Sequence, residues 1–380
     1  MSTVHWLGAG LSSLPGIKKV ALSGQGMILW NRSLSKAQES VTSLGVDIPV
    51  KELDWDVLSS EVKEGDVVVS MLPVSLHLQV AELCLARNSN FISSSYISPE
   101  ISKLHAASLM KGLCFVNEVG LDPGFDHVLA HALMIEYQNS DAFDKSNAHY
   151  FRSYCGGFPK VANEFRYKFS WSPFGVLKAL KSPAQWIEDG EIKQTEKPWL
   201  ALSTFYMQLE NGDVESFQAY PNRDSLPFRD QYGFNESWNI KEFVRGTLRL
   251  DGWAEAWKPL FDEVDTLSGD QGLERLQEIS NELWDKHQYE VGEADRVVLS
   301  VELEAQDSEG NLVWKKNNSV DAAGNEKGSA MGRLVSLNVA IAIDLLVKGK
   351  LQKGVSAAPH DPSVIKYWMN ELSALDETVF

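Results

Sequence analysis

Three short segments in the first half of the chain hold polar side chains whose types suit chemistry. The stretch Ser-Tyr-Ile-Ser contains Tyr96 and Ser98, the stretch Asp-Pro-Gly-Phe-Asp-His begins with Asp122, and the stretch Cys-Gly-Gly-Phe-Pro begins with Cys155. The first stretch follows an apolar run typical of a parallel strand, and open α/β sheets bind ligands outside the carboxyl ends of such strands. We therefore expect Tyr96 and Ser98 to contact a ligand, and Asp122, which leaves the next strand in the same direction, to project toward the same crevice.

A turn with two glycines near the start of the chain predicts a dinucleotide site. Gly8 and Gly10 follow the apolar run 4–7 and open a helical stretch. Glycines at such a turn let backbone amides approach a pyrophosphate, and the N-terminus of the helix favours its negative charge. Because Ser13 replaces the third glycine of the G-x-G-x-x-G pattern, the prediction depends on the position of the turn within a strand-turn-helix-strand unit.

The residues at the end of the second predicted strand favour NADP(H) over NAD(H). Asn31-Arg32-Ser33 stands where an NAD enzyme usually carries a carboxylate for the ribose hydroxyls. Arg32 can form a bidentate, charge-assisted pair with a 2′-phosphate, and Ser33 and Lys36 could add donors. The alternative is a simple tight turn beside a solvated arginine. The predicted cofactor-binding residues are Gly8, Gly10, Leu11, Asn31, Arg32, Ser33, Leu72 and Pro73.

The order of the predicted elements indicates an α/β fold with a doubly wound parallel sheet of the Rossmann type. Strands that are separated by helices imply right-handed crossovers and parallel pairing. The apolar runs predicted as strands are 4–7, 27–30, 66–72, 90–94 and 114–117, and the helical stretches between them include 75–88 and 99–111.

The pattern changes after residue 124, which predicts a second domain of the α+β class. A helix at 127–138 is followed by β-rich segments. Residues 296–306 and 311–320 alternate apolar and polar side chains across a turn, as in a hairpin. Residues 253–288 carry Trp, Leu and acidic residues at helical spacing, which indicates a small helical insert.

The composition excludes several classes of protein. A formal net charge of −17 without a dense cluster of Lys or Arg would repel nucleic-acid phosphates. The three cysteines show no C-x-x-C spacing, and His127 and His131 lack the H-E-x-x-H signature of a metal site. The apolar run 334–347 is interrupted by Asn338 and Asp344 and is predicted to be a buried helix too short to cross a bilayer. We expect a cytoplasmic protein that binds no metal, nucleic acid or membrane.

Several longer motifs resemble the saccharopine dehydrogenases of the L-glutamate-forming type, also called saccharopine reductases. They are the three segments named first together with residues 167–172, 220–227 and 245–249, and the likeness runs from about residue 65 to about residue 255. The resemblance implies that the amine of glutamate condenses with the aldehyde of α-aminoadipate semialdehyde, and that NADPH reduces the resulting imine to saccharopine. The expected partners are these small amino-acid substrates and a second copy of the chain in a homodimer.

The resemblance also implies how the chain divides into domains. An NADP-binding Rossmann domain is expected at 1–123 and 335–380, an α+β substrate and dimerisation domain at 124–236 and 295–334, and a small helical domain at 237–294. The cofactor is expected across the ends of the first and fourth strands, and the substrate between the Rossmann and β-rich domains.

By this resemblance, Tyr96, Asp122 and Cys155 are the catalytic positions. Tyr96 or Cys155 could relay protons during imine formation, and Asp122 could complement the iminium or the product ammonium. Saccharopine presents three carboxylates, and a guanidinium fork grips a carboxylate bidentately, so Arg223 and Arg245 are the predicted anchors. Further substrate contacts are assigned to Ser98 and Ser172.

Each of these assignments has a structural alternative. Arg223 could pair with Asp224 in its proline-flanked loop, as surface ion pairs commonly do. Asp122 could cap a helix, and Cys155 could be an inert buried thiol.

Two alternative functions follow from the same motifs. One is an imine reductase like carboxynorspermidine synthase, which joins a diamine to aspartate semialdehyde and would need an acidic pocket rather than several cations. The other is a regulatory NADP-binding protein without turnover. Departures from the family pattern leave room for the regulatory protein, and they lie at the Ser-Ser-Leu-Pro stretch after Gly10, at residues 332–336 and in a shortened helical domain.

Overall fold

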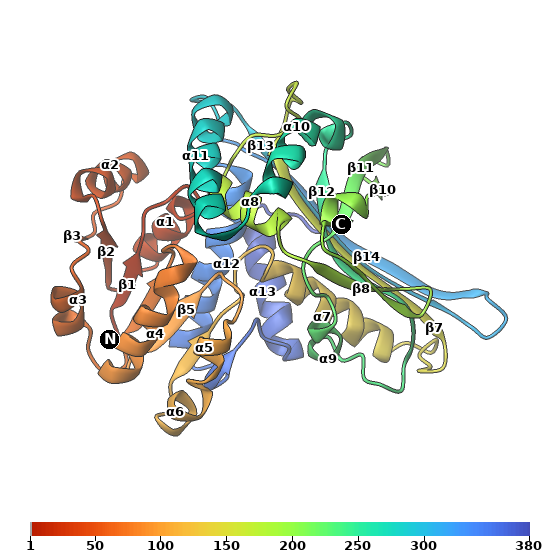
Figure 1. Cartoon of the computed structure of the whole chain (residues 1–380). Coiled ribbons are helices and arrows are strands. Elements are labelled where there is room, and N and C mark those ends of the chain that lie inside the picture. The colour runs from red at the N-terminus through yellow and green to blue at the C-terminus, as the bar shows by residue number, and fades with distance from the viewer. Residues whose placement is uncertain (1) are drawn as a thin grey trace. The chain divides into compact units, whose positions relative to one another are not determined.

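The structure, a computed structural model, describes residues 2–380 and divides into two compact units (Figure 1). Unit 1 runs to Val128 and resumes over Glu326–Glu377, and unit 2 comprises Leu129–Asn325 and Thr378–Phe380. The expected third, helical domain lies within unit 2, so the division into three domains stays a prediction.

Unit 1 is built on a sheet in the order β15-β6-β5-β4-β1-β2-β3, in which every pairing is parallel. This confirms the Rossmann-type sheet. The strand order reverses between β1 and β4, which is where an open α/β sheet forms its ligand crevice. The strands are β1 (Val4–Leu7), β2 (Met27–Asn31), β3 (Val50–Glu52), β4 (Val67–Ser70), β5 (Asn90–Ser93), β6 (Cys114–Val116) and β15 (Gly354–Ser356).

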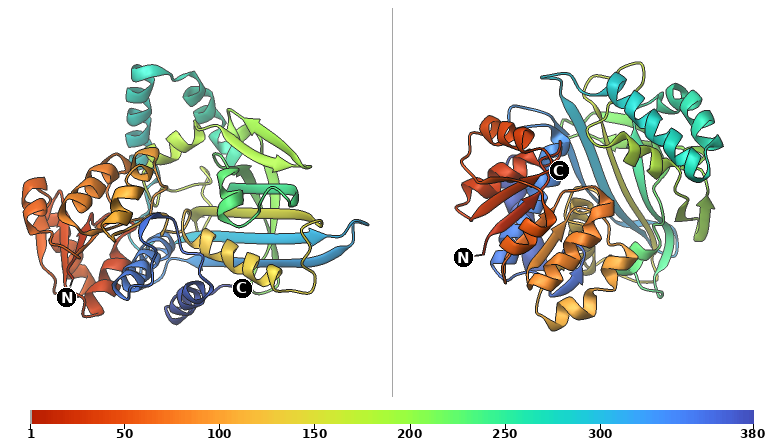
Figure 2. Two further views of the ribbon diagram at one scale, coloured as in Figure 1. Left: turned by 90° about the horizontal axis from the view of Figure 1, so that it is seen from below. Right: turned by 60° about the vertical axis from the view of Figure 1, so that its left-hand side comes forward.

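Helices cover both faces of this sheet (Figure 2), so β1, β4 and β5 are buried along their whole length. The single helix expected over 99–111 is wrong. A turn in which the Leu104 N–H bonds the Ile101 carbonyl interrupts it. The helices are α1 (Leu14–Leu22), α2 (Leu34–Leu44), α3 (Trp55–Glu61), the 3₁₀ turn η1 (Val74–Leu76), α4 (His77–Arg87), α5 (Pro99–Ser102), α6 (His105–Met110), α12 (Ala330–Val347) and α13 (Pro362–Ala374).

Helix α12 forms the centre of the packing beside the dinucleotide turn. By length and composition it is the one helix among residues 2–380 that could cross a membrane, so the prediction of a run too short to do so is wrong. The prediction of a buried helix is confirmed, because 72% of it is buried inside the protein. The Gly16 N–H donates to Ser336 Oγ at 2.8 Å, and a Cβ at Gly16 would lie 2.4 Å from the Ser336 carbonyl oxygen. Gly16 therefore provides the close helix packing that the missing third glycine of the fingerprint provides elsewhere.

Unit 2 contains a sheet in the order β10-β11-β12-β7-β13-β14, with the β8-β9 hairpin paired to β12. All pairings are antiparallel except that of β12 with β7, and the predicted hairpin of β13 and β14 is confirmed. The strands are β7 (Ala148–Pro159), β8 (Ala184–Glu188), β9 (Glu191–Thr195), β10 (Ser203–Gln208), β11 (Val214–Pro221), β12 (Asn239–Arg249), β13 (Asp295–Gln306) and β14 (Leu312–Ala323).

The remaining helices pack around aromatic side chains. Helix α7 (Phe125–Gln138) begins in unit 1 and continues along the long strands of unit 2 (Figure 2), where Tyr137 contacts the rings of His149 and Trp314. Trp253 and Trp257 are fully buried and join the helical pair α10–α11 to the segment after β7. The other helices are α8 (Pro173–Leu180), η2 (Pro198–Leu200), α9 (Pro227–Gln231), α10 (Trp253–Thr266) and α11 (Gly269–His287).

Candidate active site

The glycine turn after β1 has the geometry of a pyrophosphate site. Gly8 has φ +102°, and a Cβ there would lie 2.8 Å from the Met71 carbonyl oxygen and 3.5 Å from the Leu72 side chain. A Cβ at Gly10 would meet nothing within 4 Å, so a ligand can approach its backbone. At the start of α1 the Ser13 hydroxyl is buried without a hydrogen-bond partner among the described residues. Such an orphaned donor next to a helix N-terminus suits a bound phosphate.

The tip of β2 presents donors and a cation but no carboxylate. Asn31 links this tip to the glycine turn, because its Oδ1 accepts the Ala9 N–H at 3.2 Å. The Ser33 hydroxyl caps α2 by accepting the Lys36 N–H at 3.4 Å. Arg32 is exposed and makes no ion pair or hydrogen bond with any residue that the structure describes. This set of groups fits a 2′-phosphate. Exposed Leu11 and the residues Leu72 and Pro73 after β4 lie at the same edge of the sheet.

The structure brings Tyr96 and Asp122 together, as the sequence predicted. The loops after β5 and β6 place the Tyr96 hydroxyl 3.2 Å from Asp122 Oδ1, to which it donates. Ser98 on the same loop has a local role, because its hydroxyl accepts the Ile101 N–H at 3.2 Å and caps α5. The Tyr96–Asp122 pair follows the carboxyl ends of parallel strands, where open α/β sheets bind ligands.

Glu118, Asp126 and His127 form a cluster of buried ionisable groups whose contacts were not predicted from the sequence. Glu118 Oε2 is 2.9 Å from His127 Nε2, and His127 Nδ1 is 3.5 Å from Asp126 Oδ2. The Asp126 carboxylate also accepts the Gly124 N–H at 2.6 Å. His127 is thus a fully buried histidine within ion-pair distance of two carboxylates. Among residues 2–380 no group of three or more His, Cys, Asp or Glu side chains could hold a metal.

A second buried histidine holds the other side of the Tyr96 loop. His77 Nδ1 lies 2.8 Å from Ser70 Oγ, and its Nε2 lies 2.9 Å from Ser95 Oγ. Burial lowers the pKa of His77 to about 4. The imidazole is therefore neutral near pH 7 and links β4 to the residue before Tyr96.

The predicted residues of unit 2 lie in and around β12. Cys155 is 9% exposed in β7, between Thr247 of β12 and Leu299 of β13.

The Arg245 guanidinium lies 3.9 Å from the ring centre of Phe228. The loop before it is tied to β12, because the Asn222 N–H donates to the Arg245 carbonyl at 2.8 Å and the Arg245 N–H donates to Ser225 Oγ at 3.0 Å. Arg223 in this loop has φ +59°. The loop that carries Arg223 and the strand that carries Arg245 therefore form one hydrogen-bonded unit. Exposed Ser172 caps α8.

Arg249, at the end of the same strand, was not predicted as a site residue from the sequence. Arg249 is 6% exposed and forms no ion pair with a carboxylate of residues 2–380. Its guanidinium lies 5.0 Å from the Tyr167 ring, 5.5 Å from Tyr220 and 5.3 Å from Trp253. Its Nη1 donates to the Leu248 carbonyl at 3.1 Å. Burial of a cation without a carboxylate is unfavourable, and the rings and this hydrogen bond compensate only in part. This arrangement suits an anionic ligand.

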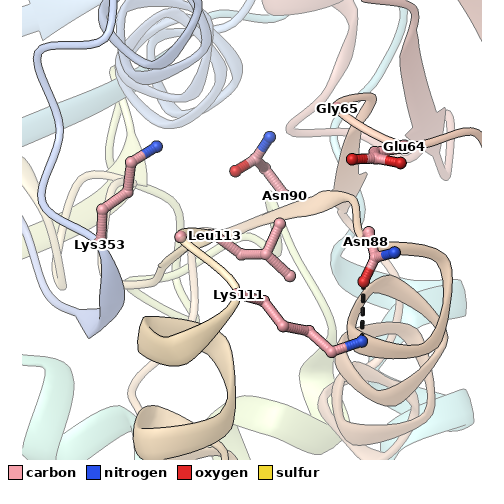
Figure 3. Close-up of a pocket in the computed structure, with 8 residues that line it drawn as sticks. Glu64, Gly65, Asn88, Asn90, Lys111, Leu113 and Lys353 are labelled. Atoms are coloured by element: carbon pink, nitrogen blue, oxygen red, sulfur yellow. Dashed lines mark hydrogen bonds between the residues drawn. The ribbon is translucent and has the colours of Figure 1, made fainter.

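A hollow of about 410 Å³ lies at the amino ends of the parallel strands of unit 1 (Figure 3). Its residues precede or begin strands, and Lys111 donates to Asn88 Oδ1 at 2.7 Å. The hollow therefore lies away from the carboxyl ends that carry the glycine turn and the Tyr96–Asp122 pair. It is lined by Glu64, Gly65, Asn88, Asn90, Lys111, Gly112, Leu113 and Lys353.

Comparisons with known proteins agree with this geometry. The model of the saccharopine dehydrogenase NADP binding domain matches residues 4–116, and that of the saccharopine dehydrogenase C-terminal domain matches residues 120–375. The chain is 27% identical to the saccharopine dehydrogenase [NADP(+), L-glutamate-forming] of Pyricularia oryzae, over 97% of this chain and 96% of that protein. It is 34% identical to the protein of the same name from Saccharomyces cerevisiae, over 67% of this chain and 56% of the relative.

Solved structures give the same result. The apo saccharopine dehydrogenase (L-Glu forming) of Saccharomyces cerevisiae superimposes with a TM-score of 0.79 at 25% identity, and all of both chains is covered. The homospermidine synthase of Legionella pneumophila has a TM-score of 0.65 at 11% identity, which is a likeness of fold alone. The residues around the glycine turn fit NADP(H), and the matched domain makes it the cofactor of this oxidoreductase. The chain belongs to the saccharopine dehydrogenase family.

Proposed function

We propose that this protein reduces the imine of L-glutamate and α-aminoadipate semialdehyde to saccharopine with NADPH, and runs the reverse oxidation with NADP⁺. The proposal rests on the full-length similarity to the Pyricularia oryzae protein of that name. In the forward direction the imine carbon gains a hydride and the nitrogen gains a proton, so that a secondary amine forms. The cofactor, when bound, supplies the hydride.

The polar pair of unit 1 is proposed to serve the nitrogen of the substrate. The Tyr96 hydroxyl donates to Asp122 at 3.2 Å, and a carboxylate there complements the positive charge of the protonated imine and of the product amine. Cys155 is proposed as a further catalytic position, next to strands that carry the arginines. Its burial within the sheet supports a contact role rather than that of a nucleophile.

The arginines of unit 2 are proposed to bind the carboxylates of the substrate. Arg223 and Arg245 belong to one hydrogen-bonded unit, and Arg249 adds a buried guanidinium without a carboxylate partner of its own. A guanidinium that is already desolvated loses little further solvation when a carboxylate arrives, so the pair is strong. The number of these anchors favours a substrate with several carboxylates over a diamine.

Assembly and location are proposed as a cytoplasmic homodimer that binds neither nucleic acid nor membrane. The net charge of −17 supports the first exclusion. Among the relatives, the α-aminoadipic semialdehyde synthases of rat and cattle are named as mitochondrial, so the compartment requires a fractionation experiment. Light scattering on the purified protein would give the mass of the assembly, and a mass equal to one chain would reject the dimer.

One parallel assay tests the reaction. Purified protein is mixed with NADPH, aminoadipate semialdehyde and glutamate, beside a second mixture with aspartate semialdehyde and a diamine. We expect loss of NADPH absorbance in the first mixture only, with saccharopine identified by mass spectrometry. Loss in the second alone would assign the protein to polyamine synthesis. NADPH binding without loss in either mixture would make it a regulatory protein.

A further inference from the structure

We infer that Glu118 is a positioning residue that holds the Tyr96 phenol against Asp122. The inference rests on the proposed function, in which this pair serves the imine nitrogen. Glu118 follows β6 with φ +56°, a left-handed backbone conformation that residues with a side chain adopt rarely. Such conformations persist only where the surrounding contacts fix them, and they gather at active sites.

Glu118 holds the Tyr96 loop at two points that flank the tyrosine. Its backbone N–H donates to the Ser95 carbonyl at 3.1 Å, and its Oε1 accepts the Ile97 N–H at 3.0 Å. The residue between these two bonds is Tyr96. Together with the bond of His77 to the Ser95 hydroxyl, they fix the direction in which the phenol projects toward Asp122.

The other oxygen of the Glu118 carboxylate connects to the loop that carries Asp122. Its Oε2 is 2.9 Å from His127, and His127 contacts Asp126, whose carboxylate accepts the Gly124 N–H. Gly124 lies two residues after Asp122. The same polar cluster therefore holds both loops of the reacting pair, and removal of the Glu118 charge should loosen them together.

The position of Glu118 also separates its role from that of a catalytic residue. Its side chain is 7% exposed and that of His127 is 0% exposed. Both carboxylate oxygens contact other protein groups rather than open space. Hydrogen bonds between buried groups are strengthened by the low local dielectric, so the cluster can fix the loops firmly.

A double-mutant cycle tests the inference. Glu118→Gln keeps an oxygen for the Ile97 N–H but removes the negative charge beside His127. We expect it to lower kcat for saccharopine oxidation by about tenfold to a hundredfold with KM for NADP⁺ unchanged, since a displaced catalytic group can cost that much. In a Tyr96→Phe background the same change should lower kcat by less than about twofold, because a residue that acts through the phenol has nothing left to position.

Asp66→Asn is the matched control. Asp66 is a buried carboxylate of the same unit that accepts the Thr3 and Lys63 N–H groups at 2.7 and 2.8 Å and lies 3.3 Å from His5 Nε2. It directly precedes β4 and so lies at the amino ends of the parallel strands, whereas Tyr96 and Asp122 follow the carboxyl ends. This variant should lower Tm without changing kcat. An equal loss of kcat from Glu118→Gln in both backgrounds would reduce Glu118 to a stabilising residue and overturn the inference.

Hydrogen exchange at the Ile97 amide gives a readout that does not depend on the substrate. We expect Glu118→Gln to speed exchange of this amide relative to the rest of β5 and β6, and Asp66→Asn to leave it unchanged. Unchanged exchange in Glu118→Gln would overturn the inference whatever the activity. If the wild-type protein failed to oxidise saccharopine, the proposed function would fall, and the exchange measurement alone would decide on the role of Glu118.

Discussion

The polar groups of unit 1 and the buried cation of unit 2 are stabilised in opposite ways. In unit 1, Tyr96 donates to Asp122, and Glu118 and His127 lie 2.9 Å apart, so these groups contact one another before any ligand arrives. In unit 2, Arg249 is surrounded by aromatic rings and has no carboxylate partner among residues 2–380. The difference suggests a division of labour. Under the proposed function, the groups of unit 1 are organised before the substrate binds, whereas Arg249 of unit 2 gains a carboxylate partner from the substrate.

Asp122→Asn should have the largest effect, because it removes the carboxylate charge from the preorganised pair of unit 1. We expect kcat to fall by about a hundredfold to a thousandfold, the range for removal of a group that assists proton transfer or stabilises charge. KM for saccharopine and the affinity for NADPH should change little. Steady-state kinetics and a fluorescence titration of NADPH would measure both. A variant whose KM rises while kcat stays constant would place Asp122 on the binding side and break the comparison.

Arg249→Met tests the other side of the comparison. We expect KM for saccharopine to rise by about a hundredfold, the loss of one charge-assisted pair, with kcat much less affected. Arg249 has no carboxylate partner among residues 2–380, although its Nη1 donates to the Leu248 carbonyl at 3.1 Å, so replacement by an apolar side chain of similar length should leave Tm nearly unchanged. An arginine with a purely structural role would instead lower the stability when it is replaced.

Arg333→Met in unit 1 is the matched control for that change. Arg333 is also buried, but it pairs with the buried carboxylate of Glu377 at 2.6 Å. Its removal leaves that carboxylate buried without its partner, which typically costs about 3–5 kcal/mol. Denaturant unfolding should therefore separate the two variants. If both arginines destabilised the protein equally when replaced, Arg249 would have a structural partner and its assignment as an anchor would fail.

Much of the fold could be predicted from the sequence because its signals are local. Apolar runs alternating with helical stretches predicted the parallel sheet, and the hairpin of β13 and β14 followed from alternation across a turn. Strand β3 was missed because its short sequence, Val50–Glu52, carries one apolar residue. The helix over 99–111 was predicted too long because nothing in its composition marks the break after Ser102.

The candidate site was predictable only where a motif lies on one segment. Tyr96 and Asp122 could be placed together because both follow neighbouring parallel strands. Glu118 could not, since its role depends on a left-handed backbone conformation and on a histidine from another element. Arg249 was missed because Arg245 in the same motif is an equally good guanidinium, and the sequence does not show that Arg249 is buried among aromatic rings.

A pH titration compares the two units through one buried histidine in each. Burial lowers the pKa of His77 in unit 1 and of His149 in unit 2 to about 4. Between this value and the unfolded value of about 6.5, the unfolded chain binds more protons than the folded chain, so stability is full above pH 6.5 and is lost as the pH falls. We expect the free energy of unfolding to fall by on the order of 2 kcal/mol per histidine between pH 7 and pH 5.

His77→Gln and His149→Gln should each reduce that pH dependence by about half of the pair's contribution, as measured by denaturant unfolding at both pH values. Each variant will have a lower stability at pH 7 because it loses hydrogen bonds, so the slope and not the absolute value is compared. A slope that stayed at the wild-type value in His77→Gln would mean that the imidazole is accessible to protons in the folded state. The neutral link from β4 to the Tyr96 loop would then be wrong.

Arg32→Ala should have the smallest effect. It tests whether unit 1 also contains a cation whose anionic partner is supplied by the ligand. Arg32 is exposed and forms no ion pair within the described chain, so its loss should not change Tm. We expect KM for NADPH to rise by about tenfold while KM for NADH stays the same, because an exposed pair with the 2′-phosphate is weakened by solvent. Lys36→Ala, one turn into α2, is the control cation and should change the ratio of the two KM values less. Equal losses with NADPH and NADH would mean that Arg32 contacts a part common to both cofactors. The preference for NADP(H) would then depend on the hydroxyl groups and the helix N-terminus at Ser33.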